Sequence, residues 1–257
     1  MSTSSFTFTS KTTDFTTHLS NPINLIDKKY EVALVRLETF NSFPNIIENV
    51  NNIFRYSPDN GTTWKEIRLD TGSYEINDMN IEIARQMTNN GDYDVVNTES
   101  YINIIIFASR VIVIIKHDSY KVDFSVRYSI GKMLGFPEEI LTAGFHKSPD
   151  FVDANPITSI FVHVDIVTGS YLNGRNSQII YTFAPAVRPG AKIIEAPSPL
   201  EFLPIYQSMI HSIRIWLTDE DNKSINNIGE DLIVRLSIKE IVTIEESFIN
   251  AMEKIKE

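Results

Sequence analysis

The chain has no cysteine among its 257 residues, which excludes disulfide bonds and metal sites built from thiolates. Such a chain suits assembly in a reducing compartment such as the cytoplasm or the nucleus. A secretory signal is also missing, because the Ser- and Thr-rich start lacks a basic segment followed by a continuous apolar one. We therefore expect a protein that stays outside the secretory pathway.

Long apolar runs are scarce as well. The longest stretch, residues 102–117, is interrupted by Asn103, Ser109 and Arg110, and its uninterrupted pieces are too short to cross a bilayer. We interpret it as two buried strands and expect no membrane-spanning segment.

Basic residues are outnumbered, with 23 Lys and Arg against 33 Asp and Glu, which gives a formal net charge of −10. This charge repels a phosphate backbone, and neither end of the chain carries a basic arm. We expect no direct contact with nucleic acid.

Motifs for catalysis or metal binding are few. The sequence has no nucleophile elbow, no Ser-His-Asp order and no zinc-binding helix motif. Only His163 and Asp165 place a histidine and a carboxylate at metal-ligand spacing, on the polar face of one predicted strand. They could bind a cation or form an acid–base pair, but an exposed or interface contact is the favoured interpretation. We expect no catalytic residue, no metal, no cofactor and no enzyme activity.

The segment Gly169–Asn176 spaces two glycines as a phosphate-binding loop does. It lacks the Lys-Ser/Thr pair of such loops and precedes a strand instead of a helix. We interpret it as a tight loop in which glycine supplies positive φ angles.

Short alternating segments dominate the rest of the chain and predict β-strands. Val122, Phe124 and Val126 alternate with polar residues, as do Ile160, Val162 and others in their strand, which is typical of half-buried antiparallel sheets. Strand, long helix and strand never alternate, so an α/β fold is disfavoured. The predicted fold class is all-β, a single jelly-roll β-sandwich.

Helices are expected only in connections and at the end. One should follow Asp78, with Met79, Ile83 and Met87 on its apolar side, and a second should cover Ser129–Leu134. A C-terminal helix is expected at 244–257. We expect one domain over residues 1–257, with a flexible N-terminal arm at 1–25 and the helical tail at 244–257.

Residues 209–240 read as two alternating strands joined by a polar loop, the pattern of a hairpin. Trp216 and Arg214 alternate with the inward residues and so face away from the core. For Trp216 two interpretations stay open: a contact with another protein, or cover by a segment of the same subunit. The candidate subunit-interface residues are Phe161, His163, Asp165, Arg214 and Trp216.

Four stretches together resemble the penton (minor capsid) proteins of Polinton (Maverick) elements, adintoviruses and virophages. They are Gly72–Tyr74, Phe124–Phe136, Gly169–Gly174 with Ile180–Pro185 and Pro189-Gly190, and the predicted closing hairpin. The resemblance implies a single jelly roll that assembles as homopentamers at icosahedral vertices, next to the major capsid protein. It implies a protein of the virion that is assembled in the host cytoplasm or nucleus.

Two alternatives stay open. The chain could be a small major-capsid-type jelly-roll subunit, which would assemble with a different symmetry. It could instead be a glycan-binding β-sandwich protein or a carbohydrate-active enzyme.

Overall fold

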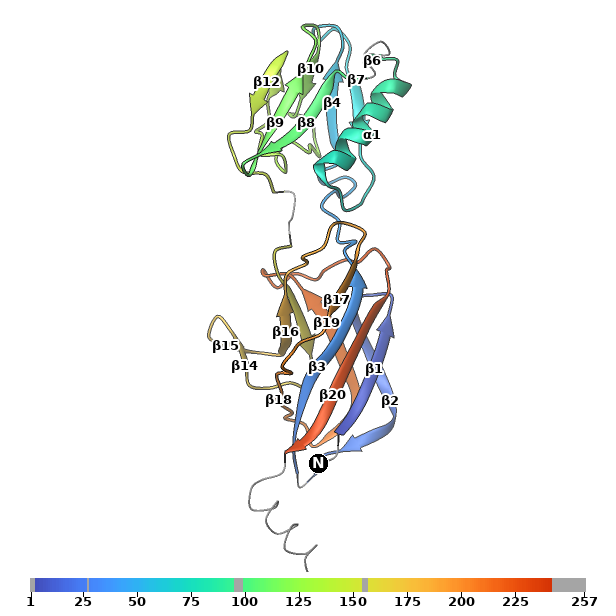
Figure 1. Ribbon diagram of the computed structural model, residues 1–257, viewed down its shortest axis with the longest axis vertical. Coiled ribbons are helices and arrows are strands. Elements are labelled where there is room, and N and C mark those ends of the chain that lie inside the picture. Colours follow the sequence, from blue (N-terminus) through green and yellow to red (C-terminus); the bar gives the residue numbers. More distant parts are fainter. Residues whose placement is uncertain (1–2, 27, 95–98, 154–156, 242–257) are drawn as a thin grey trace, which may run out of the picture. The chain divides into compact units, whose positions relative to one another are not determined.

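The chain folds into two compact units in a computed structural model that describes residues 3–26, 28–94, 99–153 and 157–241. Unit 1 consists of Met1–Asn41 and Ile157–Glu257, and unit 2 consists of Ser42–Pro156. The all-β prediction is confirmed (Figure 1). The single domain expected over residues 1–257 stays a prediction, and within the chain the first unit contains the second as an insertion. The chain passes between the two units after Asn41 and before Ile157, and neither position lies in a Gly/Ser-rich linker. The composition of the sequence therefore carries no signal of this division.

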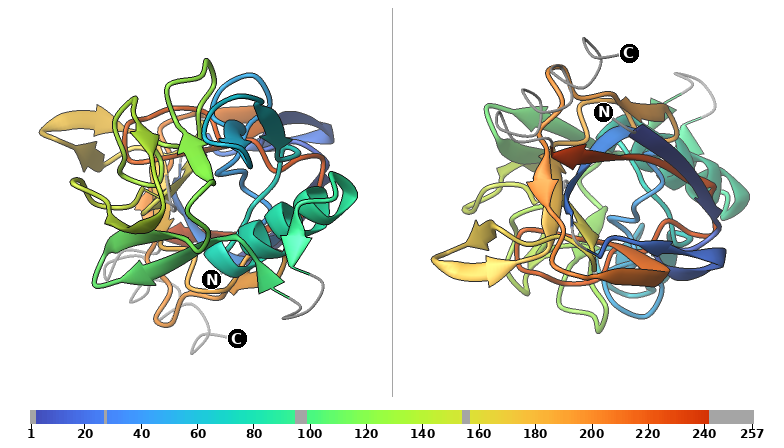
Figure 2. Two further views of the ribbon diagram at one scale, coloured as in Figure 1. Left: turned by 90° about the horizontal axis from the view of Figure 1, so that it is seen from above. Right: turned by 90° about the horizontal axis from the view of Figure 1, so that it is seen from below.

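Unit 1 contains two facing antiparallel sheets (Figure 2, right). The first sheet has the order β1-β20-β3-β17, with β18 also paired to β3, and the second has the order β16-β13-β19-β2. The strands are β1 (Thr3–Ser10), β2 (Asp14–Asn24), β3 (Lys29–Phe40), β13 (Ile160–Val164), β16 (Ile179–Phe183), β17 (Lys192–Glu195), β18 (Leu203–Pro204), β19 (Met209–Thr218) and β20 (Leu232–Ile241). A separate hairpin is formed by β14 (Ser170–Leu172) and β15 (Arg175–Ser177).

The pairing within unit 1 is nested. Setting aside β18 and the separate hairpin, the first strand pairs with the last (β1 with β20) and the second with the next to last (β2 with β19). The same rule joins β3 to β17 and β13 to β16. A long hairpin of strands wrapped into two sheets produces this order, which is that of a jelly roll. The jelly-roll prediction is therefore confirmed for unit 1.

The core of unit 1 comes from the inward residues of both sheets. In β19, Ile213, Ile215 and Leu217 are fully buried, and in β20 the buried residues include Val234 and Leu236. Because alternate side chains of a strand point to opposite faces, the residues between them lie on the outer faces.

Two expectations about unit 1 are corrected. Residues 1–25, expected as a flexible arm, instead provide β1 and β2, one strand to each sheet. Phe8 is buried, so this segment gains apolar burial as well as strand hydrogen bonds. The strands of residues 209–240 exist, but they lie in opposite sheets and do not form a hairpin. Alternation of apolar and polar residues shows which face of a strand is buried. It does not distinguish two strands of a hairpin from two strands that lie in facing sheets, because both pairs show the same alternation.

Unit 2 has sheets of order β11-β10-β4-β5 and β12-β9-β8, and a short β6-β7 pair. Its elements are β4 (Ile53–Ser57), β5 (Lys65–Arg68), α1 (Ile76–Asn89), β6 (Tyr93–Asp94), β7 (Glu99–Ser100), β8 (Ile102–Phe107), β9 (Arg110–Ile115), β10 (Lys121–Asp123), β11 (Ile140–Leu141) and β12 (Gly144–Lys147). The unit has its own apolar core, which includes Phe54, Tyr56, Ile104 and Phe124.

The first predicted helix exists as α1 and buries Met79, Ile83 and Met87 fully, but it begins at Ile76, before the expected cap Asp78. Glu75 is its N-cap, and the Asp78 side chain accepts the Glu75 backbone N–H.

The second predicted helix is wrong: Ser129 forms a β-bridge with Ile53, and residues 131–135 form hydrogen-bonded turns, with a bond from the Leu134 amide to the Ile130 carbonyl. Gly135 at φ +80° and then Pro137 end this segment before a regular helix develops. The predicted helix at 244–257 lies outside the described residues, and within them no helix is long and apolar enough to span a membrane.

Candidate functional site: a cleft on the outer face of unit 1

A cleft of about 980 Å3 lies in unit 1 beside the hairpin β14–β15. The hairpin turns at Asn173-Gly174, where both residues have positive φ angles of 51° and 77°. Asn and Gly tolerate this left-handed conformation, which two-residue hairpin turns require. The prediction of a tight loop at 169–176 is thus confirmed, and the loop forms one wall of the cleft.

The floor of the cleft holds a stacked pair of rings, His163 on β13 and Trp216 on β19. The ring centroids are 4.8 Å apart and the planes lie 8° from parallel. A hydrogen bond of 2.9 Å joins His163 Nε2 to Thr218 Oγ1. Burial lowers the pKa of His163 to about 4, because a charged imidazole would lose its hydration there. The ring pair is therefore neutral and fixed in orientation at pH 7.

Charged groups flank this ring pair on the outer face of the same sheet. The Arg214 guanidinium lies 4.8 Å from the Trp216 ring and donates hydrogen bonds of 2.9 and 2.7 Å to the two carboxylate oxygens of Asp14. The bonds from Arg214 lower the pKa of Asp14. Asp165 accepts the backbone N–H of Arg214 at 3.0 Å, and burial raises the pKa of this carboxyl group. Arg214 is therefore held against the indole by its ion pair with Asp14.

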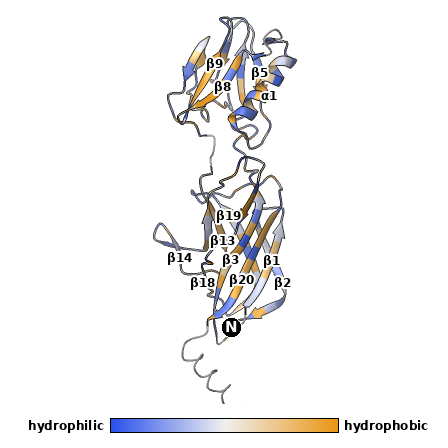
Figure 3. Ribbon diagram, in the orientation of Figure 1, coloured by the Kyte–Doolittle hydropathy of each residue, from blue (hydrophilic) through white to orange (hydrophobic). Residues whose placement is uncertain are grey.

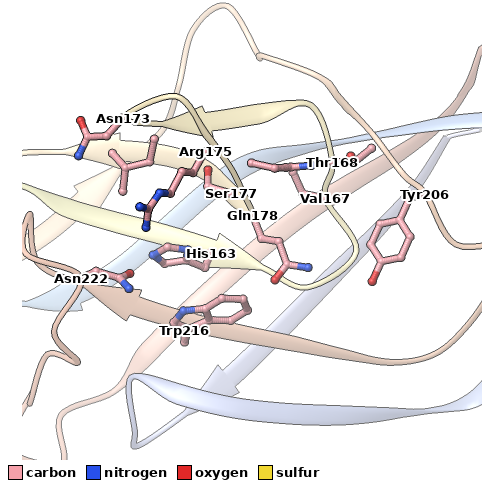
Figure 4. A pocket seen from close by; sticks show the side chains of 12 residues that line it. His163, Val167, Thr168, Asn173, Arg175, Ser177, Gln178, Tyr206, Trp216 and Asn222 are labelled. Carbon is pink, nitrogen blue, oxygen red and sulfur yellow. The ribbon is translucent and has the colours of Figure 1, made fainter.

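Polar side chains make up most of the remaining lining. Arg175 on β15 and Gln178, between β15 and β16, reach toward the ring pair (Figure 4). The lining residues are His163, Val167, Thr168, Leu172, Asn173, Arg175, Asn176, Ser177, Gln178, Tyr206, Trp216 and Asn222. Amide and hydroxyl groups of this kind both donate and accept hydrogen bonds. The arrangement can bind a polar ligand, and among the described residues no three potential ligand side chains gather as a metal site.

The sequence-predicted residues all lie on this outer face. The register pairs Phe161 with Thr218 and His163 with Trp216, which places these side chains outside the core. His163 and Asp165 do not form the pair considered above, because the first bonds to Thr218 and the second to Arg214. His163 is also only 4% exposed, so another subunit could reach it only through its neighbours. A subunit contact at these residues stays a prediction.

Sequence reasoning missed the cleft residues that come from the β14–β15 hairpin and from connections, namely Asn173 and Arg175 in the hairpin and Tyr206 and Asn222 in connections. The Asn-Gly dipeptide inside residues 169–176 was the available signal, since it predicts a protruding two-residue turn. No sequence pattern linked that turn to Tyr206 or to Asn222.

A second surface feature lies in unit 2, on the sheet β12-β9-β8, whose strands β8 and β9 are strongly apolar (Figure 3). The two strands of the 102–117 stretch are confirmed, but only one of their faces is buried. On the other face Ile105, Phe107 and Phe145 are 39%, 59% and 78% exposed. Arg110 lies over the ring of Phe151, which is 68% exposed, at 4.8 Å. Such a group of exposed apolar side chains is typical of a protein contact.

The nested strand order makes the chain a jelly-roll protein. In structure it is similar to the mavirus penton protein, with a TM-score of 0.49 and 10% identity over 93% of this chain and 100% of that chain. It is also similar to a chain of the Sputnik virophage, with a TM-score of 0.43 and 14% identity over 96% and 98% of the two chains. No protein-family model and no curated protein sequence matches the chain.

Proposed function

We propose that this chain is a structural capsid protein, the penton subunit of a Polinton-like virus or virophage. The observation that carries the proposal is the nested jelly-roll pairing of unit 1 in a chain whose sequence resembles penton proteins in four separate stretches. A jelly roll alone would not suffice, because the same fold serves lectins and enzymes.

The resembling stretches fall at positions with defined structural roles. Phe124 and Phe136 are core residues of unit 2, and their rings stack with centroids 5.3 Å apart. Gly169–Gly174 forms the start of the hairpin beside the cleft, and residues 180–183 belong to β16. The resemblance therefore extends over both units and involves residues that shape the fold.

Assembly requires surfaces that contact copies of the same chain and neighbouring capsid proteins. A five-fold ring closes through heterologous contacts, in which two different patches of each subunit meet. We assign one such patch to the apolar face of Ile105, Phe107 and Phe145. The outer-face residues Phe161, Asp165, Arg214 and Trp216, with His163 beneath them, remain the candidates in unit 1.

The proposed partners are the chain itself, as a homopentamer, and the major capsid protein. The proposed location is the virion, after assembly in the host cytoplasm or nucleus. In this role the protein needs no cofactor and no catalytic group. With its net charge of −10 it would not bind nucleic acid directly.

The test is the mass of the purified protein by light scattering, together with class averages from electron microscopy. Five-fold rings are expected. Trimers or pseudo-hexagons would favour the major-capsid alternative, and a monomer that binds or cleaves oligosaccharides without assembling would contradict the capsid role.

A pair of variants connects the result to the apolar face. Phe145→Ser should shift the protein from rings to smaller species, because it removes an apolar side chain from the contact. Ile81→Ser is the matched control, since Ile81 is 61% exposed on α1 of the same unit. Equal effects of both variants would contradict the assignment of this face.

A further inference from the structure

The cleft of unit 1 has the chemistry of a sugar-binding site with a preference for one negative charge. We propose that it binds an acidic saccharide, whose carboxylate or sulfate group pairs with Arg175. This inference stands on the cleft alone and does not depend on the capsid proposal.

Hydrogen-bonding capacity is the first argument. The walls carry the amides of Asn173, Asn176, Gln178 and Asn222. Gln178 uses its amide N–H to bond the Asp165 carbonyl at 2.7 Å, which fixes this side chain in the cleft. A sugar hydroxyl both donates and accepts, so convergent amides match it better than they match an apolar ligand.

An exposed aromatic ring provides the second argument. Tyr206 lines the cleft and is 60% exposed, while its hydroxyl accepts a hydrogen bond from the Gln207 amide at 3.3 Å. Its ring face can pack against the apolar C–H face of a pyranose ring. The indole of Trp216 cannot do the same, because His163 and Arg214 already lie against it. Trp216 instead forms part of the floor, and its fluorescence is expected to change when a ligand enters the cleft.

Charge is the third argument. Arg175 is the cationic residue of the lining, and the described structure gives its guanidinium no hydrogen bond or ion pair. No Asp or Glu occurs among the described residues that line the cleft. The nearby Asp219 carboxylate is occupied by the backbone N–H groups of Asp221 and Lys223, at 3.0 and 2.7 Å. The local charge therefore favours an anionic group on the ligand.

The overall charge limits how anionic the ligand can be. A net charge of −10 repels polyanions such as nucleic acids or heavily sulfated chains. One guanidinium in a polar cleft suits a saccharide with a single acidic group, which a bidentate contact can recognise.

The binding test uses the full chain with Trp64→Phe, which leaves Trp216 as the single tryptophan. The probes are lactose, sialyllactose and sulfated lactose. The binding of each probe is measured by the change in Trp216 fluorescence emission and by calorimetry. Sialyllactose, sulfated lactose or both should bind more tightly than lactose, and the two acidic probes distinguish carboxylate from sulfate recognition. Failure of both acidic probes to bind, or binding no tighter than that of lactose, would overturn the proposal.

Two variants locate the charge contact. Arg175→Gln should weaken binding of the acidic probe by roughly tenfold, the loss typical of one charge-assisted hydrogen bond, and leave lactose unchanged. Arg188→Gln makes the same charge change at an exposed arginine of unit 1 outside the cleft and should have no effect. Equal weakening by both variants would show a general charge effect and would refute a specific site at Arg175.

Discussion

The imidazole of His163 and the indole of Trp216 stack face to face across neighbouring strands, 4.8 Å apart between centroids. The pair sits on the outer face of the sandwich, yet His163 is only 4% exposed. A basic group enclosed in this way makes the stability of unit 1 depend on pH.

Protonation of His163 should destabilise the fold. The folded-state pKa of about 4 lies below the 6.5 of an unperturbed histidine, so the unfolded chain binds the proton more tightly. The contribution of the neutral ring is fully present above pH 6.5 and is lost as the pH falls toward 4. Between pH 7 and pH 5 we expect the native chain to lose roughly 2 kcal/mol of unfolding free energy relative to His163→Asn.

Denaturant unfolding of both proteins at the two pH values measures this difference. His18→Asn, an exposed histidine on the edge strand β2, controls for the removal of a histidine as such. Parallel pH profiles of the native chain and His163→Asn would contradict the prediction.

Gly135 should not tolerate a side chain. It has φ +80°, and a Cβ atom there would lie 2.5 Å from the backbone oxygen of Asp150. Gly135→Ala should therefore destabilise unit 2 by about 3 kcal/mol or more, through strain and a clash with backbone. Gly91→Ala is the control, because Gly91 has φ +75° with no atom within 4 Å of the added Cβ. Thermal unfolding of both variants measures the two losses of stability. Gly91→Ala reports the backbone strain alone, so equal losses in the two variants would contradict a clash at Gly135.

The ion pair of Arg55 and Asp123 should matter more than a surface pair. Asp123 is 1% exposed, and although burial would raise its pKa, hydrogen bonds from Ser125 and Arg55 hold that pKa below its usual value. Asp123→Ala should cost about 2 kcal/mol, because it removes the buried acceptor of hydrogen bonds from Arg55 and Ser125. Asp231→Ala removes an exposed pair with Lys11 and should leave the unfolding transition unchanged. Similar losses in chemical denaturation would refute this ranking.

Unit 2 should fold as an isolated fragment. Residues 42–156 contain a complete apolar core and their own sheets. The fragment should show a cooperative unfolding transition and dispersed amide resonances. A fragment with collapsed resonances and no transition would show that the unit depends on unit 1.

The strands were largely predictable from the sequence, whereas their partners were not. Residues 210–217 and 232–241 show the alternation that the structure confirms, but alternation cannot tell a sheet neighbour from a strand in the opposite sheet. The same limit hid the insertion, because a crossing between units resembles an ordinary loop when it lacks a distinctive composition. The prediction of a helix at Ser129–Leu134 was wrong because six residues with a helical pattern are too few to stabilise a helix against local turns.

The candidate site was predictable in part for a related reason. Phe161, Arg214 and Trp216 lie on regular strands, so their outward orientation follows from period-two alternation. Arg175 comes from the short strand β15, whereas Tyr206 and Asn222 come from connections between strands. Their approach to one cleft is set by the path of the chain in three dimensions, which no local pattern encodes.

The chain leaves unit 1 after Asn41 and returns at Ile157, so unit 2 interrupts only the link between β3 and β13. The nested strand pairs of unit 1 all form between residues outside 42–156. Evolution could therefore exchange the inserted unit for a different one while the strands of unit 1 keep their register.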